Sequence, residues 1–290
     1  MRAREPDSEG FVDRDGVKLH FEVLGDGEPT LLLLPTWTII HARFWKAQVP
    51  YLARHFRVVT YDGPGNGGSD RPLDAGPYGF EEQARAAAAV LDATGTDRAV
   101  VVSLSMGAQW ALWLMANQPE QVLGSVFIGP AVALEPGVGD LDPPFDEPYT
   151  STDGWARYNR YYWLDHYQDF LEFFFGQCFT EAHSTKQIED SVGWGLETSP
   201  EVLIAEHAGP EPDDATARGW CAASRCPVLV IHGGDDHIAA PRHGRALAEA
   251  TGGRLVVLEG AGHIPNARDP VRVNRLIREF AESLPGGGPG

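Results

Sequence analysis

Unbroken apolar runs of strand length recur along the 290-residue chain, and they constrain its fold more than any other feature. They occupy residues 31–34, 58–61, 99–103, 125–128, 228–231 and 255–258. Strands that helices cover on both faces have this pattern, whereas strands with one solvent-facing side alternate apolar and polar residues. The runs therefore predict a parallel sheet buried between two layers of helices.

Helix-like stretches separate these runs. They cover residues 80–93, 106–117, 242–250 and 271–283. Before the first run, residues 11–24 are expected to form two short strands around the turn at Asp13–Gly16. Alternating strands and helices predict an α/β fold with a mostly parallel central sheet flanked by helices.

The alternation stops between about Glu135 and Arg225, where Pro, Gly and Asp crowd both ends of an aromatic-rich segment. We expect an α/β core formed by residues 1–134 and 224–290. Residues 135–223 are expected to form a helical cap, or lid, inserted between the sixth and seventh strands.

The cap segment is rich in aromatic residues, since residues 135–220 hold 15 of the 29 in the chain. Trp155, Tyr158 and Tyr162 share one face at helical spacing. Most cap aromatics are expected to attach the cap to the core. A minority are expected to line a substrate pocket, and the candidates are these three residues together with His41.

The formal net charge of −18 is concentrated in the same segment, where residues 135–220 hold 18 Asp and Glu against 4 Lys and Arg. Such a surface repels phosphate backbones and anionic lipids, and no apolar run approaches the roughly 20 residues of a membrane span. Nucleic acid and membrane are therefore not expected as partners. The start of the chain lacks a secretory signal, and its three cysteines form no disulfide framework, which predicts a cytoplasmic protein.

A serine between an apolar strand and an apolar helix gives the strongest chemical signal. Residues 101–108 read Val-Val-Ser-Leu-Ser-Met-Gly-Ala. A nucleophilic serine at such a junction lies on a tight turn that needs small residues two positions before and after it. Ser105 meets this requirement with Ser103 and Gly107, so it is the candidate nucleophile. The amide of Met106, at the helix N-terminus, is a candidate oxyanion donor.

A base and an orienting carboxylate follow later in the chain. His263 comes directly after the last apolar run and is the candidate base. Asp235 and Asp236 follow the run at 228–231, which gives the order Ser, Asp, His of a triad built on an α/β sheet. Asp236 is the preferred acid, with Asp235 as the alternative. His232 is expected to be a buried structural residue.

No cofactor or metal is expected. Residues 63–68 match the pattern G-x-G-x-x-G after a strand, but prolines in the following residues prevent the helix that a dinucleotide site needs. Asp235 and Asp236 lie near His237 and His243 in sequence, but no further metal ligands accompany them.

With these residues placed, the chain resembles the α/β-hydrolase fold family over about residues 11–134 and 224–284. The resemblance is carried by Ser103–Gly107 as the nucleophile elbow, Asp62–Ser69 as the glycine-rich loop, Gly233–Asp236 as the acid turn and Gly262-His263 as the catalytic histidine. In the family the fourth residue of the acid turn is catalytic, which favours Asp236.

One loop departs from the family pattern. After the run at 31–34 the family commonly has His-Gly, whereas this chain has Pro35-Thr36. The position that donates the second oxyanion amide falls on Trp37. A tryptophan there resembles the cofactor-free perhydrolase and aryl-esterase branch. Losing the glycine at Thr36 changes the conformational freedom of the loop.

These features together predict a serine hydrolase that cleaves carboxylic esters or lactones of neutral, fairly apolar small molecules through an acyl-enzyme. The same triad would also serve a carbon–carbon bond hydrolase, a thioesterase or a lactone-forming enzyme. A different class of function is a ligand-binding protein of this fold with little turnover. The sequence leaves the oligomeric state open.

Overall fold

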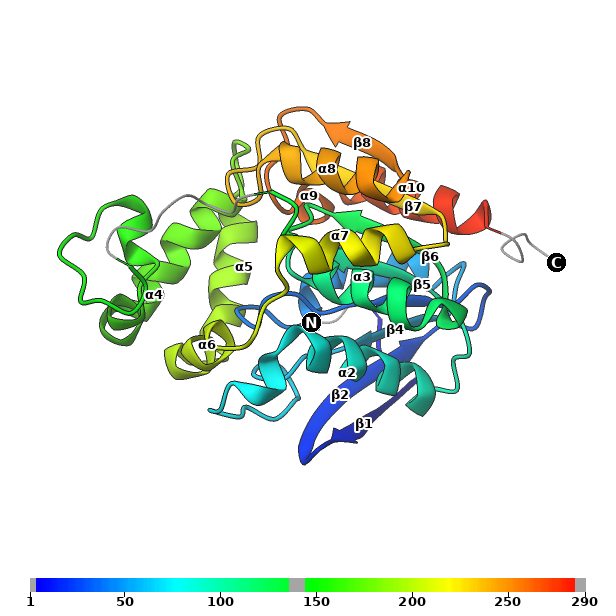
Figure 1. Ribbon diagram of the computed structural model, residues 1–290, viewed down its shortest axis with the longest axis horizontal. Helices are drawn as coiled ribbons and strands as arrows, with labels where there is room; N and C mark the ends of the chain where they lie inside the picture. The colour runs from blue at the N-terminus through cyan, green and yellow to red at the C-terminus, as the bar shows by residue number, and fades with distance from the viewer. Residues whose placement is uncertain (1–3, 136–143, 285–290) are drawn as a thin grey trace.

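The structure is a computed structural model that describes residues 4–135 and 144–284. It contains an eight-stranded sheet with the order β1-β2-β4-β3-β5-β6-β7-β8 (Figure 1). β1 (Ser8–Arg14) and β2 (Val17–Leu24) form an antiparallel hairpin, and β2 pairs antiparallel with β4. The remaining pairs are parallel, between β3 (Leu31–Leu33), β4 (Val58–Tyr61), β5 (Ala99–Leu104), β6 (Val122–Ile128), β7 (Val228–Gly233) and β8 (Arg254–Leu258). The predicted α/β fold with a mostly parallel sheet is confirmed.

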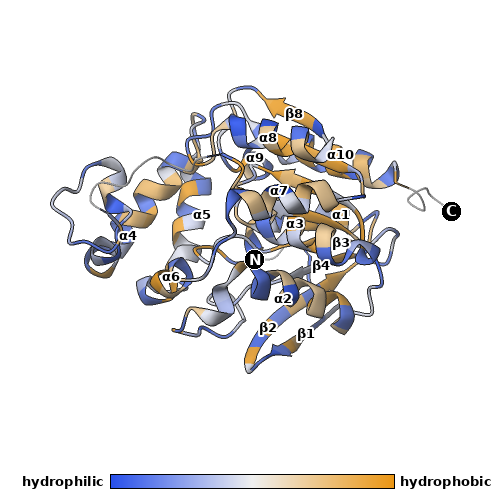
Figure 2. Cartoon of the chain, in the orientation of Figure 1, coloured by the Kyte–Doolittle hydropathy of each residue, from blue (hydrophilic) through white to orange (hydrophobic). Residues whose placement is uncertain are grey.

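Two hydrophobic cores, one on each face of the sheet, explain the unbroken apolar runs. Leu31 and Leu33 belong to one core and Leu32 to the other, and all three are fully buried. Successive strand residues point to opposite faces, so both faces demand apolar side chains. Figure 2 shows this concentration of apolar residues in the central strands.

Helices form a layer on each side of the sheet. The first layer contains α2 (Phe80–Ala93), α3 (Gly107–Asn117), α7 (Asp214–Ala223) and α8 (Pro241–Thr251). The second contains the short helices η1 (Ala42–Ala47), α1 (Val49–Leu52) and α9 (Pro265–Arg268), together with α10 (Pro270–Glu282). The connections include two single turns, η2 (Gly76–Tyr78) and η3 (Pro119–Gln121).

Of the helices between β6 and β7, all those before α7 project to one side of the sheet (Figure 1). They are η4 (Gly154–Arg157), α4 (Arg160–Cys178), α5 (Thr185–Gly195) and α6 (Pro200–His207). The next helix, α7, lies over the sheet beside α3 and α8 and so packs with the core layer, although it falls in the segment expected to form the cap. Part of the expected linker, residues 136–143, lies outside the described residues.

Buried aromatic side chains of α4 attach the projecting helices to the sheet. Trp163 and Phe170 have no exposed surface, and they share one core with Leu104 at the end of β5. Each buried aromatic ring removes a large apolar area from water, so this contact is strongly stabilising. Across the described residues, every helix is too short or too polar to span a bilayer.

Candidate active site

Ser105 lies on a strained turn between β5 and α3. Its φ is 52°, in the left-handed region that non-glycine residues rarely adopt. Backbone hydrogen bonds hold the turn: the Ser105 amide donates to the Ile128 carbonyl at 3.0 Å, and the Ser105 carbonyl accepts from Ala131 at 3.1 Å. Sheet hydrogen bonding thus fixes a conformation that directs a side chain away from the strand end.

Small neighbours make this turn possible. A Cβ placed on Gly107 would lie 2.5 Å from the carbonyl oxygen of Pro35, which is closer than carbon and oxygen approach without a bond. Ser103, two residues before Ser105, is fully buried. Gly107 therefore lets the loop that follows β3 lie directly against the turn.

The structure brings Ser105, His263 and Asp236 together from three separate loops. His263 Nε2 lies 2.9 Å from Ser105 Oγ, and His263 Nδ1 lies 2.8 Å from Asp236 Oδ2. His263 is buried, while Ser105 is half-buried. A hydroxyl, an imidazole and a carboxylate in this order can pass a proton from the hydroxyl to the ring and stabilise the resulting imidazolium.

Asp236 is buried and fully hydrogen-bonded. Its Oδ1 accepts from the amides of Ile238 at 2.8 Å and Ala239 at 2.9 Å, and its Oδ2 also lies 3.1 Å from His232 Nε2. Burial opposes ionisation, but the charge of His263 and the hydrogen bonds from both histidines outweigh it, so the pKa of Asp236 is far below its ordinary value. The group is a carboxylate at every working pH.

The second acid of the pair points elsewhere. Asp235 Oδ1 lies 3.3 Å from His237 Nε2, and both side chains are about half exposed. The structure therefore places Asp236, and not Asp235, against His263. His232 is buried in β7, as the sequence suggests, but its contact with Asp236 was not foreseen.

The two candidate oxyanion donors belong to two different segments: Met106 directly follows Ser105, and Trp37 lies in the loop that contacts Gly107. Met106 is the residue that precedes the first turn of α3, and it is half-buried. Trp37 lies in the loop after β3, whose carbonyl at Pro35 touches the α3 end of the turn. The Trp37 indole packs among cap aromatics, with ring centroids 5.0 Å from Phe174 and 5.9 Å from Trp163.

A carboxyl group from one of the projecting helices, which the sequence analysis missed, holds this loop. Both oxygens of Glu206 in α6 lie within hydrogen-bond distance of the Thr38 amide, at 3.2 and 3.1 Å. The Trp37 side chain lies close enough to this carboxyl group to favour its ionised form. Burial raises the pKa of Glu206 to about 8, although the hydrogen bond from Thr38 and the nearby Trp37 side chain oppose that rise.

The end of α4 is hydrogen-bonded to the loops that carry Asp235 and His263. The Cys178 carbonyl accepts from the His263 amide at 2.9 Å, and Glu181 Oε1 accepts from the Gly262 amide at 3.0 Å. Thr180 Oγ1 donates to the carbonyl of Asp235 at 3.2 Å. Local sequence patterns carry no signal for these contacts, because they join segments about 55 to 85 residues apart.

Only some of the candidate pocket residues from the aromatic-rich segment lie beside Trp37. The Tyr158 ring lies 5.9 Å from that of Trp37, and the Trp155 ring lies 6.4 Å from that of Tyr158. Tyr162 instead bonds Asp169 and packs against Tyr149.

The single helical face implied by the spacing of Trp155, Tyr158 and Tyr162 is wrong. η4 ends before Tyr158, and Asn159 begins α4 by accepting hydrogen bonds from the amides of Tyr161 and Tyr162. The chain therefore changes direction between Tyr158 and Tyr162, and the two residues do not lie on one helix.

His41 lies at the start of η1 and contacts the segment after α5. Its Nε2 is 3.4 Å from a carboxylate oxygen of Glu197, and its ring packs against Trp194. Burial lowers the pKa of His41, which favours the neutral imidazole.

Two cavities of the described part of the chain are not lined by Ser105, Asp236 or His263. One of about 80 Å³ separates η1, α5 and α9, and its wall includes Phe179 and Ile264. Ile264 is the residue next to His263. The other, about 340 Å³, lies between the β1–β2 hairpin and α2.

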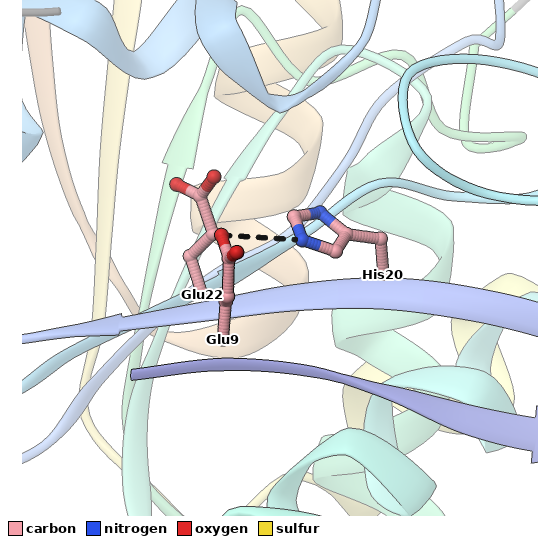
Figure 3. A group of neighbouring side chains, drawn as sticks. All are labelled: Glu9, His20 and Glu22. Atoms are coloured by element: carbon pink, nitrogen blue, oxygen red, sulfur yellow. Dashed lines mark ion pairs between the residues drawn. The ribbon is translucent and has the colours of Figure 1, made fainter. Parts of the chain in front are cut away.

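One group of possible metal ligands occurs among the described residues, on the β1–β2 hairpin (Figure 3). It contains Glu9, His20 and Glu22, whose ligand atoms lie within 4.8 Å of one another. The carboxylate of Asp62, 3.6 Å from His20 Nδ1, raises the pKa of His20 despite its partial burial, and His20 Nε2 lies 3.7 Å from Glu9. The raised pKa favours the positively charged form of His20 beside these acids. Asp235, Asp236, His237 and His243 are not gathered in this way.

The chain resembles characterised hydrolases over most of its length. A profile of the alpha/beta hydrolase fold matches residues 29–270. Rhodomycin D methylesterase DauP of Streptomyces sp. (strain C5) is 31% identical over 282 residues, 87% of this chain and 91% of DauP. The similarity to RutD of Variovorax paradoxus (strain S110) is 37% over 112 residues and spans only 41% of that protein.

Solved structures share the fold at lower identity. The enol-lactonase from Burkholderia xenovorans LB400 superposes with a TM-score of 0.76 and 23% identity, over 93% of this chain and 99% of the enol-lactonase. Because the family profile spans most of the chain and the sheet has the matching architecture, the chain belongs to the α/β-hydrolase fold family and is a hydrolase.

Proposed function

We propose that this hydrolase is a serine esterase that cleaves carboxylic esters or lactones of neutral, fairly apolar small molecules through an acyl-enzyme on Ser105. One observation carries the proposal: a strained serine is the first member of a continuous Ser105–His263–Asp236 hydrogen-bond chain. Neither a strained serine nor a His–Asp pair alone would indicate a nucleophilic serine.

The chemistry follows from the order of the three groups. His263 Nε2 takes the proton of Ser105 Oγ as the oxygen attacks the ester carbonyl, and Asp236 stabilises the imidazolium. When the tetrahedral intermediate collapses, His263 returns the proton to the departing alcohol. A water molecule, deprotonated by His263, then attacks the acyl group and releases the acid. All groups required for these steps come from the chain, so no cofactor is invoked.

The amides of Trp37 and Met106 are the proposed donors to the oxyanion. Each such donor lowers the barrier by roughly 3 kcal/mol in related enzymes. Their placement on the loop after β3 and at the first turn of α3 puts them on opposite sides of Ser105 along the chain. The tight approach of Pro35 to Gly107 keeps the two segments in contact.

The preference for apolar substrates rests on the side chains around Trp37. Tyr158, Trp163 and Phe174 pack around its indole. Trp163 and Phe174 belong to α4 and Tyr158 to the turn before it, in the projecting segment that we propose as the cap over the substrate. The acidic charge of this segment disfavours polyanionic esters such as those of coenzyme A. The similarity to a methylesterase supports ester cleavage.

A substrate screen with a matched blank tests the proposal. Short esters, long esters, lactones, thioesters and diketones are incubated with the purified protein and with Ser105→Ala. We expect turnover of esters or lactones that the Ser105→Ala variant lacks, and labelling of Ser105 by a fluorophosphonate probe. Full activity in Ser105→Ala contradicts the proposal. A passive binding protein would show neither turnover nor labelling.

A further inference from the structure

Glu206 is a buried carboxyl group that has no cationic partner among the described residues, at the junction of the projecting helices and the core. The buried acids among the described residues are Asp62, Asp236 and Glu206. Asp62 and Asp236 each contact histidines, whereas Glu206 contacts the Thr38 amide and the Trp37 side chain. Burying an acid against uncharged donors alone is costly, so its position next to the proposed oxyanion loop requires a physical account.

The two contacts of Glu206 restrain Trp37 at two separate points. The hydrogen bond from the Thr38 amide fixes the peptide plane that joins Trp37 to Thr38. The Trp37 indole lies beside the same carboxyl group, and its packing against Phe174 and Trp163, with ring centroids 5.0 and 5.9 Å away, restrains its rotamer. With the following peptide and the side chain both held, the residue has little freedom left to rotate its own amide.

Core residues restrain the same loop as well: the Ile40 amide donates to the Trp37 carbonyl at 3.2 Å, and Pro35 lies against Gly107. Asn66 Nδ2 donates to the Thr38 carbonyl at 2.8 Å, and Thr38 Oγ1 donates to the Pro64 carbonyl at 3.2 Å. Of the hydrogen bonds made by Thr38, the one to Glu206 is the link to the cap. The loop has Pro35-Thr36 before Trp37 and therefore lacks a glycine that could adapt its direction.

We propose that Glu206 is a positioning residue for the oxyanion hole: it orients the Trp37 amide by holding Thr38 and the Trp37 indole, so that the cap completes the catalytic site. The inference rests on the proposed function, since it assigns a role within the same reaction. Glu206 itself exchanges no proton with the substrate.

The charge of Glu206 offers a separate readout of this role. The groups that face it are Glu211 after α6, Tyr78 of η2, Tyr158 after η4 and Tyr167 of α4. Burial keeps the pKa of all three tyrosines well above the ordinary value, so they stay neutral, and partial desolvation raises the pKa of Glu211. The carboxylate form accepts the Thr38 amide N–H more strongly than the acid, so kcat is expected to rise as Glu206 ionises near pH 8.

The test compares Glu206→Gln with Glu201→Gln, which makes the same replacement at an exposed position of the same helix. Loss of an interaction that matters in the transition state lowers kcat and leaves KM almost unchanged. Above pH 8, where the wild-type carboxyl group is ionised, we expect kcat of Glu206→Gln to be lower by up to about 100-fold, the cost of misplacing a group by about 1 Å. Its pH profile is expected to lose the inflection near 8. Glu201→Gln is expected to keep both the wild-type kcat and the inflection.

Trp37→Phe supplies an independent variant, because it removes the indole N–H and leaves an aromatic ring. If the two side chains act through one contact, the effects of Glu206→Gln and Trp37→Phe on kcat are less than multiplicative in the double variant. If Glu206→Gln does not fold, Trp37→Phe tests the inference by itself: an unchanged kcat in Trp37→Phe overturns the role of Glu206.

The outcomes separate this inference from the proposed function. Absence of Ser105-dependent turnover in the wild type refutes the proposed function itself. Ser105-dependent turnover with a wild-type kcat and pH profile in Glu206→Gln overturns only the role of Glu206. A fall in kcat that matches the loss of folded protein, with the inflection retained, assigns Glu206 a purely structural part and also overturns the proposal.

Discussion

His232 Nε2 lies 3.1 Å from Oδ2 of Asp236, and neither side chain has any exposed surface. The same carboxylate oxygen accepts from His263, so two imidazoles share one acceptor. His232 Nε2 also lies 2.7 Å from the Ala239 carbonyl. The acid of the proposed triad is therefore held both by the turn that follows β7 and by a side chain of β7 itself.

Replacing His232 with Phe tests this support. The aromatic ring would still pack against Gly244, where a Cβ would lie 2.4 Å from the His232 ring, but Asp236 would lose a hydrogen bond. A hydrogen bond to a charged group contributes about 1.5 to 3 kcal/mol, so we expect an unfolding free energy lower by that amount in urea titrations. His237→Phe, at an exposed position, is the control and should change little. Equal stabilities of the two variants would contradict the role of His232.

The backbone of Ser105 predicts a difference between two inactive variants. At φ 52° an alanine keeps the left-handed strain, whereas glycine adopts this conformation freely. Ser105→Gly is therefore expected to be more stable than Ser105→Ala by about 1 kcal/mol. Parallel urea titrations measure the difference, and an Ala variant as stable as the Gly variant would show that the turn is unstrained.

Gly107 is expected to tolerate no side chain. Because a Cβ would lie 2.5 Å from the Pro35 carbonyl, Gly107→Ala must displace the loop that carries Trp37. Overpacking of this kind costs about 1 to 3 kcal/mol, and kcat should fall with the displaced amide. Gly219→Ala in α7 is the matched control, since its Cβ meets no atom within 4 Å. Removing that helical glycine should stabilise the protein by roughly 0.5 to 1 kcal/mol.

The raised pKa of Glu206 predicts a specific dependence of stability on pH. The unfolded chain releases this proton near pH 4.5, whereas the folded protein keeps it until about pH 8. The contribution of Glu206 to the free energy of unfolding is therefore fully present below pH 4.5 and is lost as the pH rises to about 8.

Unfolding free energies at pH 5 and pH 8.5 check this dependence. The wild type should lose a few kcal/mol more than Glu206→Gln over this interval, given about 1.4 kcal/mol for each unit of pKa shift. Parallel pH dependences in the two proteins would place the pKa of Glu206 near its ordinary value.

The fold could be predicted from sequence because both faces of the sheet are buried. That condition makes every residue of a run such as Leu31–Leu33 apolar, which is a local and repeated signal. The strained turn at Ser105 is local as well, since its steric demand falls on residues two positions away. The placement of His263 and Asp236 near it follows from the parallel strands, whose carboxyl ends meet at one edge.

The contacts from the cap could not be predicted in the same way, because they depend on how separate helices pack. Glu206 left one weak trace in the sequence. It follows Val202 by four residues and Leu203 by three, which places an acid on the buried face of α6. Such an acid indicates a buried partner without identifying Thr38. The spacing of Trp155, Tyr158 and Tyr162 predicted one helical face, but Asn159 begins a new helix between Tyr158 and Tyr162.

The bond between the carbonyl of Cys178 and the amide of His263 has a consequence for protein engineering. The final turn of α4 is a structural support for the loop that bears the imidazole. If the helices between β6 and β7 were exchanged for another segment, the replacement would have to present a carbonyl at this point, or the His263 loop would lose this bond and the imidazole would be misplaced.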